Sequence, residues 1–122
     1  MRFLVLIILL AAPAQAADYE KFLGTWGTVA ECARAPLKPG GTRLAEPVEI
    51  SKLWLKQGQH WCALNWGPIE PREGGAFTAA TAQCGEDSVR AYFLGLLLAG
   101  EDLTLRWDFT HLDGPLRRCP GS

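Results

Sequence analysis

Four cysteines are the residues of this sequence whose chemistry is easiest to anticipate. They are Cys32, Cys62, Cys84 and Cys119, and none of their spacings matches the close C-x-x-C pairs that are typical of zinc sites. An even number of cysteines in a short chain that carries a secretory leader indicates disulfides instead, with three possible pairings. We therefore expect disulfides, no metal site and no cofactor.

The positions of the cysteines favour one of these pairings. Cys62 and Cys84 belong to two successive stretches of alternating polarity, which suit neighbouring antiparallel strands. Cys32 and Cys119 lie near the two ends of the same domain. We favour Cys62–Cys84 with Cys32–Cys119, although the sequence leaves the other pairings open. In the chain-entropy model, links of this length contribute roughly 3.4 and 4.6 kcal/mol.

The two histidines, His60 and His111, are the candidates for acid–base catalysis by an imidazole. A hydrolytic triad also needs a nucleophile and an orienting acid held beside the histidine. No serine lies in a G-x-S-x-G motif, and Thr110-His111-Leu112-Asp113 precedes Gly114-Pro115, which is typical of a turn. We therefore predict that the protein is not an enzyme; a hydrolase that uses His60 or His111 is the weakest alternative.

Residues 1–16 have the pattern of a secretory signal. Met1-Arg2 supplies a positive end, residues 3–12 are uninterruptedly apolar, and Ala14-Gln15-Ala16 has the small residues that a signal peptidase reads. The apolar run is about half as long as the roughly 20 residues that span a bilayer. We expect cleavage after Ala16, no membrane anchor, and a periplasmic or secreted protein.

Residues 17–122 then form one domain of 106 residues with 11 basic and 13 acidic side chains, a net charge of −2. Basic residues do not cluster beyond Arg117-Arg118. This composition argues against a nucleic-acid-binding protein, and we expect a monomer.

Glycine and proline recur at short intervals, which favours short strands over long helices. The clearest strand spans residues 103–110, where Leu103, Leu105, Trp107 and Phe109 alternate with polar residues. Residues 60–66 and 77–84 are also predicted to be extended.

Three other segments are less regular. In residues 48–55 the alternation slips near Lys52, which predicts a β-bulge. Residues 88–99 suit a buried strand or a short helix, and we favour a strand. Residues 18–23 are predicted to form one helical turn on the end of a barrel. Together these patterns predict an all-β fold: a small antiparallel barrel or curved meander of six to eight strands, stapled by disulfides.

A G-x-W motif, Gly24-Thr25-Trp26, opens the domain. It resembles the opening of lipocalin-like barrels, in which the tryptophan packs across one end, and that of periplasmic Inh-type protease inhibitors, in which a cysteine follows as Cys32 does here. The inhibitors typically have one disulfide, and a lipocalin is much longer. Across most of the chain, G-x-W, four spaced cysteines and the final Arg118-Cys119 resemble small exported bacterial proteins of unassigned function. This resemblance implies a fold and a compartment but no activity.

The five tryptophans suit either a tightly packed core or a ring-lined ligand pocket. Trp66 and Trp107 are predicted to lie in the core, whereas Trp61 points away from Cys62 and is predicted to be exposed.

From these features we predict an exported, non-catalytic binding or inhibitory module that acts on a protein partner. The predicted contact residues are Trp61, Arg72 in the polar segment 70–75, and Tyr19 near the mature N-terminus. The alternative is a carrier of a small apolar ligand, which requires an open cavity inside the barrel.

Overall fold

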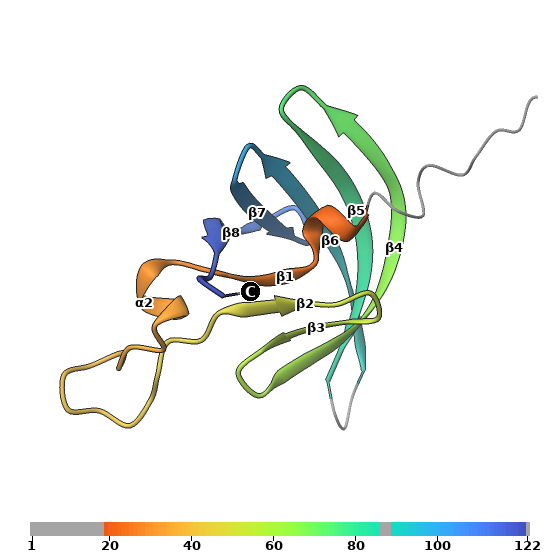
Figure 1. Cartoon of the computed structure of the whole chain (residues 1–122). Helices are drawn as coiled ribbons and strands as arrows, with labels where there is room; N and C mark the ends of the chain where they lie inside the picture. The colour runs from red at the N-terminus through yellow and green to blue at the C-terminus, as the bar shows by residue number, and fades with distance from the viewer. Residues whose placement is uncertain (1–18, 86–88, 122) are drawn as a thin grey trace, which may run out of the picture.

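The computed structural model of the chain describes residues 19–85 and 89–121. The predicted signal peptide and its cleavage site lie outside the described residues. Eight strands form a closed antiparallel barrel in which each strand pairs with the next and β1 pairs with β8 (Figure 1). The prediction of a small all-β barrel is confirmed.

The strands differ greatly in length. They are β1 (Gly24–Gly27), β2 (Val48–Ile50), β3 (Trp54–Gln57), β4 (His60–Arg72), β5 (Gly75–Cys84), β6 (Arg90–Ala99), β7 (Asp102–Trp107) and β8 (His111–Arg118). Two short helices accompany them, the 3-10 turn η1 (Tyr19–Phe22) and α2 (Val29–Cys32). The β4–β5 hairpin rises above the rest of the barrel, and the loop after α2 stands away from it (Figure 1). The barrel therefore has one tall wall, built by β4, β5 and β6.

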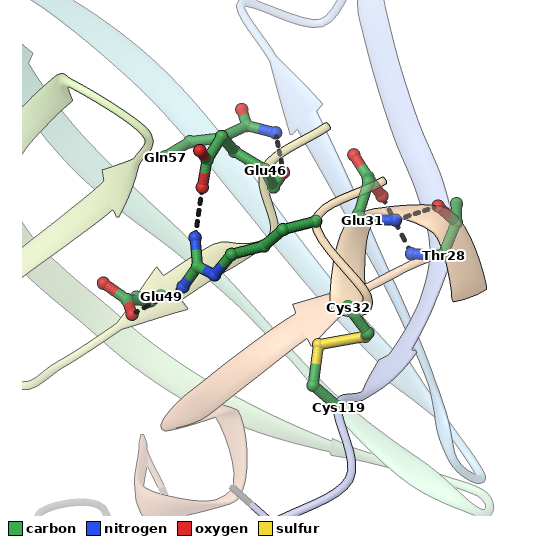
Figure 2. Close-up of a disulfide and its surroundings, with 8 residues drawn as sticks. Thr28, Glu31, Cys32, Glu46, Glu49, Gln57 and Cys119 are labelled. Atoms are coloured by element: carbon green, nitrogen blue, oxygen red, sulfur yellow. Dashed lines mark hydrogen bonds and ion pairs between the residues drawn. A yellow bond between two sulfur atoms is a disulfide. The ribbon is translucent and has the colours of Figure 1, made fainter. Parts of the chain in front are cut away.

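Both disulfides have the favoured pairing. Cys62 and Cys84 lie directly opposite each other on β4 and β5, with their Cα atoms 4.2 Å apart. Cys32 at the end of α2 bonds to Cys119, which follows β8 (Figure 2). This second link lies beside the seam where β1 meets β8, because the Cys119 N–H donates to the Thr25 carbonyl. All four cysteines are thus oxidised, so none of them is free to bind a metal.

The core consists of the inward-facing side chains of the strands and one ring from η1. Phe22 is fully buried, and its carbonyl accepts a hydrogen bond of 2.9 Å from the indole N–H of Trp26. The predicted helical turn at the barrel end is thus confirmed. Trp66 and Trp107 are half-buried at the edge of the core rather than inside it, because each directs its N–H to an oxygen at the surface.

Two predicted strand boundaries are wrong. Residues 48–55 do not form one bulged strand: β2 ends at Ile50, a turn closed by the Ser51 N–H and the Trp54 carbonyl follows, and β3 begins. The strand predicted over residues 103–110 ends at Trp107, and a three-residue connection, Asp108-Phe109-Thr110, places Phe109 in solvent. Neither turn contains glycine or proline, so the sequence carries only the weaker turn signals of Ser51 and Asp108.

Three other predictions concern the connections between strands. Residues 88–99 form a strand as favoured, with β6 beginning at Arg90; Ser88 lies outside the described residues. The predicted turn over residues 110–113 is wrong beyond Thr110, because His111 already begins β8. The polar segment 70–75, which suits either a contact loop or a plain hairpin connection, is a hairpin, since β4 continues to Arg72 and β5 starts at Gly75.

Candidate functional site

The interior of the barrel is occupied by its own side chains. The largest fully buried side chains are those of Trp26, Phe22, Leu94, Leu96, Leu103, Leu105 and Thr78. The apolar ones belong to one continuous core. The Thr78 hydroxyl donates a hydrogen bond to the Gly67 carbonyl on the neighbouring strand. Protein interiors packed in this way leave few voids larger than a water molecule.

A cavity of about 440 Å³ opens at the η1 end of the barrel. Trp26 and Leu98 contribute apolar surface, and Lys21, Arg117 and Arg118 bring three positive charges. The Arg118 guanidinium lies over the Trp26 ring at 4.3 Å and donates to the Lys21 carbonyl at 2.7 Å. Arg117 forms ion pairs with Asp102 at 3.1 Å and with Glu101 at 3.3 Å. Both arginines are thus engaged within the protein, and this end of the barrel is a structural closure.

A shallower apolar groove of about 780 Å³ runs between α2, the loop that follows it and the β3–β4 turn. Thr28 and Glu31 form a reciprocal capping box at the start of α2, with hydrogen bonds of 3.2 and 2.8 Å (Figure 2). Arg34 pairs with Glu46 and, at 3.9 Å, with Glu49. These contacts hold the loop against β2, so the groove has a defined wall.

The histidines do not assemble a hydrolytic site. His60 is exposed at the rim of this groove, and His111 is exposed on β8 with its Nε2 atom 2.9 Å from an Asp113 oxygen. The other Asp113 oxygen accepts from the Trp107 indole at 3.2 Å. Ser51 is the one serine among the described residues. It lies in the β2–β3 turn, at the end of the barrel opposite to His60 and His111. A non-catalytic role stays a prediction.

The three predicted contact residues do not come together. Trp61 is 53% exposed, as predicted, near the start of β4. Arg72 ends the same strand, where it pairs with Glu70 at 3.2 Å. Tyr19 lies on η1 and packs against Trp66, with ring centroids 5.7 Å apart. These residues therefore cannot form one compact contact surface.

A different apolar surface emerges on the outside of β5 and β6. Their outward-facing residues are all uncharged: Phe77, Ala79, Thr81, Gln83, Ala91, Phe93, Gly95 and Leu97. Phe93 is 59% exposed, and its ring lies 5.8 Å from that of Phe109, which is 69% exposed at the β7–β8 turn. We call Phe93, Phe109 and Leu97 the aromatic face.

Sequence reasoning missed the aromatic face for two reasons. Phe93 lies in an apolar run without a clear period. Phe109 follows Leu105 and Trp107 in the alternating pattern of β7, so the pattern places it on the inward face although the strand ends at Trp107. The one available signal was Asp108, because aspartate tolerates the left-handed backbone of a tight turn.

Comparisons of the chain with protein-family models, curated proteins and solved structures gave no match. The resemblance to small exported four-cysteine proteins therefore stays a prediction. Across residues 19–85 and 89–121, no helix is long and apolar enough to span a membrane. The two disulfides are consistent with an oxidising compartment.

Proposed function

We propose that this chain is an exported, non-catalytic binding module that acts on a protein partner. The observation that carries the proposal is the contrast between the two sides of the barrel wall. The interior is packed with the protein's own side chains, whereas large apolar side chains are displayed outside. A carrier of apolar ligands needs the reverse arrangement, an open interior.

The exposed apolar groups support contact with another protein. The exposed large apolar side chains among the described residues are Val29, Leu37, Leu44, Leu53, Trp61, Val89, Phe93, Leu97, Phe109 and Leu112. The outer face of an antiparallel barrel is ordinarily polar, because it faces water. Single exposed apolar residues are common, but large apolar side chains that lie together in solvent, as Phe93 and Phe109 do, are typical of an interaction site.

The closed topology indicates how such a partner is recognised. Around the barrel each described strand pairs with its two neighbours, although β3 pairs with β4 only at residues 60–63 of β4. A partner therefore finds little open sheet edge to which it could add a strand, and we expect recognition to depend on side chains. Two disulfides hold the scaffold that presents them, and a rigid surface loses little conformational entropy on binding.

The test is native mass spectrometry of the tagged protein, isolated from the exported fraction of the cells that make it. We expect a complex with a second protein, which is then purified and recombined with the barrel to measure a Kd. A tagged, unrelated disulfide-bonded barrel serves as the control. A small adduct that denaturation releases, with no protein bound, would overturn the proposal in favour of the carrier.

A further inference from the structure

We infer that Phe109 and Phe93, with Arg106 at their edge, anchor an acidic and apolar segment of the partner protein. This inference rests on the proposed function and adds where the partner binds and what chemistry its contact segment has.

The β7–β8 turn holds a phenylalanine where the backbone favours glycine. Asp108 and Phe109 have φ angles of 46° and 62°, and the Thr110 N–H donates to the Trp107 carbonyl at 3.0 Å. Two-residue hairpin turns with positive φ at both central positions ordinarily contain Asn-Gly or Asp-Gly. Aspartate tolerates this conformation, but an aromatic residue in it is an outlier. Such strain concentrates at functional sites.

Burial does not explain why this phenylalanine is present, because most of its ring is in solvent. The 69% exposed side chain of Phe109 gains little from the hydrophobic effect on folding. The hairpin would close at least as well with glycine at this position. The ring therefore has a use outside the fold, and binding a partner is a use for which an exposed aromatic side chain is suited.

Contacts within the protein hold the backbone segments that carry the two rings. The Asp108 N–H donates to the Phe93 carbonyl at 2.8 Å, and the Phe93 N–H donates to an Asp108 carboxylate oxygen at 2.9 Å. Arg90 lies 3.5 Å from the other Asp108 oxygen. These contacts join the turn to β6 and hold the Phe93 and Phe109 rings together. Anchors that are already ordered lose little entropy when they bind.

The charge beside the rings selects the kind of segment that fits. Arg106 faces outward on β7, opposite Gly95 of β6, and is diagonal to Phe93 at about 7–8 Å. It has no acidic partner within the described residues, whereas the Asp108 charge is already matched by Arg90. The surface thus offers two exposed rings and an unmatched cation. An acidic residue flanked by apolar ones complements it.

An anionic membrane has related chemistry but fits less well. Attraction to anionic lipids depends on several clustered cations, whereas among the described residues of this surface Arg106 is the one unmatched cation, and Asp108 lies at the tip of the turn. The domain also has a net charge of −2 after predicted cleavage. We therefore assign the surface to a protein segment and treat the membrane as an outcome of the test.

The experiment measures binding of a labelled peptide in which aspartate and glutamate alternate with leucine and phenylalanine. Its counterpart has lysine at each acidic position. We expect the wild-type protein to prefer the acidic peptide, and Phe109→Gly to weaken that binding about tenfold or more, as for a hot-spot residue. Phe109→Gly leaves the melting temperature close to that of the wild type, because glycine accepts this backbone.

Two matched variants control for loss of apolar surface and for charge. Leu53→Ala removes a side chain of nearly equal exposure, 68%, from the β2–β3 turn at the other end of the barrel. Lys38→Glu reverses a charge on the loop after α2 and is compared with Arg106→Glu. We expect both controls to bind the acidic peptide like the wild type, and Arg106→Glu to lose the preference for it.

Several outcomes overturn the inference. They are equal binding by Phe109→Gly and wild type, equal binding of the acidic and lysine peptides, and no binding of the acidic peptide at all. Binding to phosphatidylglycerol vesicles that the acidic peptide does not compete for would assign the surface to membranes instead. If the recombined partner protein binds Phe109→Gly as tightly as wild type, the inference fails while the proposed function stands. If no protein is bound, the proposed function fails.

Discussion

Two clusters of aromatic and arginine side chains lie at different places on this barrel and differ in what surrounds them. At the η1 end, Arg118 covers Trp26, whose ring is 1% exposed and whose indole N–H is satisfied by the Phe22 carbonyl. At the β7–β8 turn, Phe109 lies against Phe93 in solvent. The two clusters contain the same residue types, so composition alone does not distinguish them.

The two clusters differ in how many of their polar and charged groups have partners within the fold. Arg118 donates to the Leu23 and Lys21 carbonyls at 2.6 and 2.7 Å and so closes the seam between β1 and β8. Removing either member of that cluster takes away contacts made within the fold. The aromatic face has a ring in a left-handed backbone conformation and lies beside Arg106, which has no acidic partner among the described residues. The first cluster thus serves stability, and we expect the second to serve binding.

The largest effect that sharpens this comparison is on stability at the η1 end. Trp26→Ala removes a fully buried indole from the core, and we expect a loss of about 4 kcal/mol in the free energy of unfolding. Denaturant unfolding followed by fluorescence measures it. If that variant does not fold, Trp26→Phe provides the measurement, because it keeps a ring but loses the N–H donated to Phe22. A loss below about 1 kcal/mol for Trp26→Ala would contradict the structural role.

The second effect compares two arginines. Arg118→Met keeps an apolar stem but removes two hydrogen bonds to carbonyls and the stacking on Trp26, so we expect a loss of about 1–2 kcal/mol. Arg106→Met removes an exposed charge with no acidic partner among the described residues, and we expect a change within about 0.5 kcal/mol. Thermal and denaturant unfolding of both variants provide the comparison. Equal losses would show that the two arginines have the same role.

The sequence-based predictions are accurate for strands that contribute to the core and inaccurate for the turns at the surface. Strands whose alternation reaches the core were predicted, because burial imposes the period of two on residues such as Leu103 and Leu105. The disulfide pairing followed because Cys62 and Cys84 occupy neighbouring alternating stretches. Turns without glycine or proline were missed, since at Lys52 and Asp108 tertiary contacts rather than local preference bend the chain.

The position of the β7–β8 turn also determines whether the aromatic face can be predicted from the sequence. If residues 103–110 formed one strand, Phe109 would share a face with Leu103 and Leu105 and would belong to the core. Ending the strand at Trp107 moves that ring into solvent and beside Phe93. The position of a strand end therefore decides whether the same residue is interpreted as core or as a contact. Local sequence does not fix such an end when one central position of the turn holds Phe109, because an aromatic residue rarely adopts a left-handed backbone.

The stability of Phe109→Gly separates the two clusters most clearly, because opposing effects are expected to leave little net change. Phe109→Gly relieves a left-handed conformation that disfavours a residue with a side chain by roughly 1–2 kcal/mol. It also loses a ring contact worth about 0.5–1.5 kcal/mol. Because these terms oppose each other, we expect the free energy of unfolding to stay within about 1 kcal/mol of wild type. Denaturant unfolding measures it beside Trp26→Ala. A loss as large as that of Trp26→Ala would mean that Phe109 is a core residue after all, and the aromatic face would then be part of the fold rather than a surface kept for a partner.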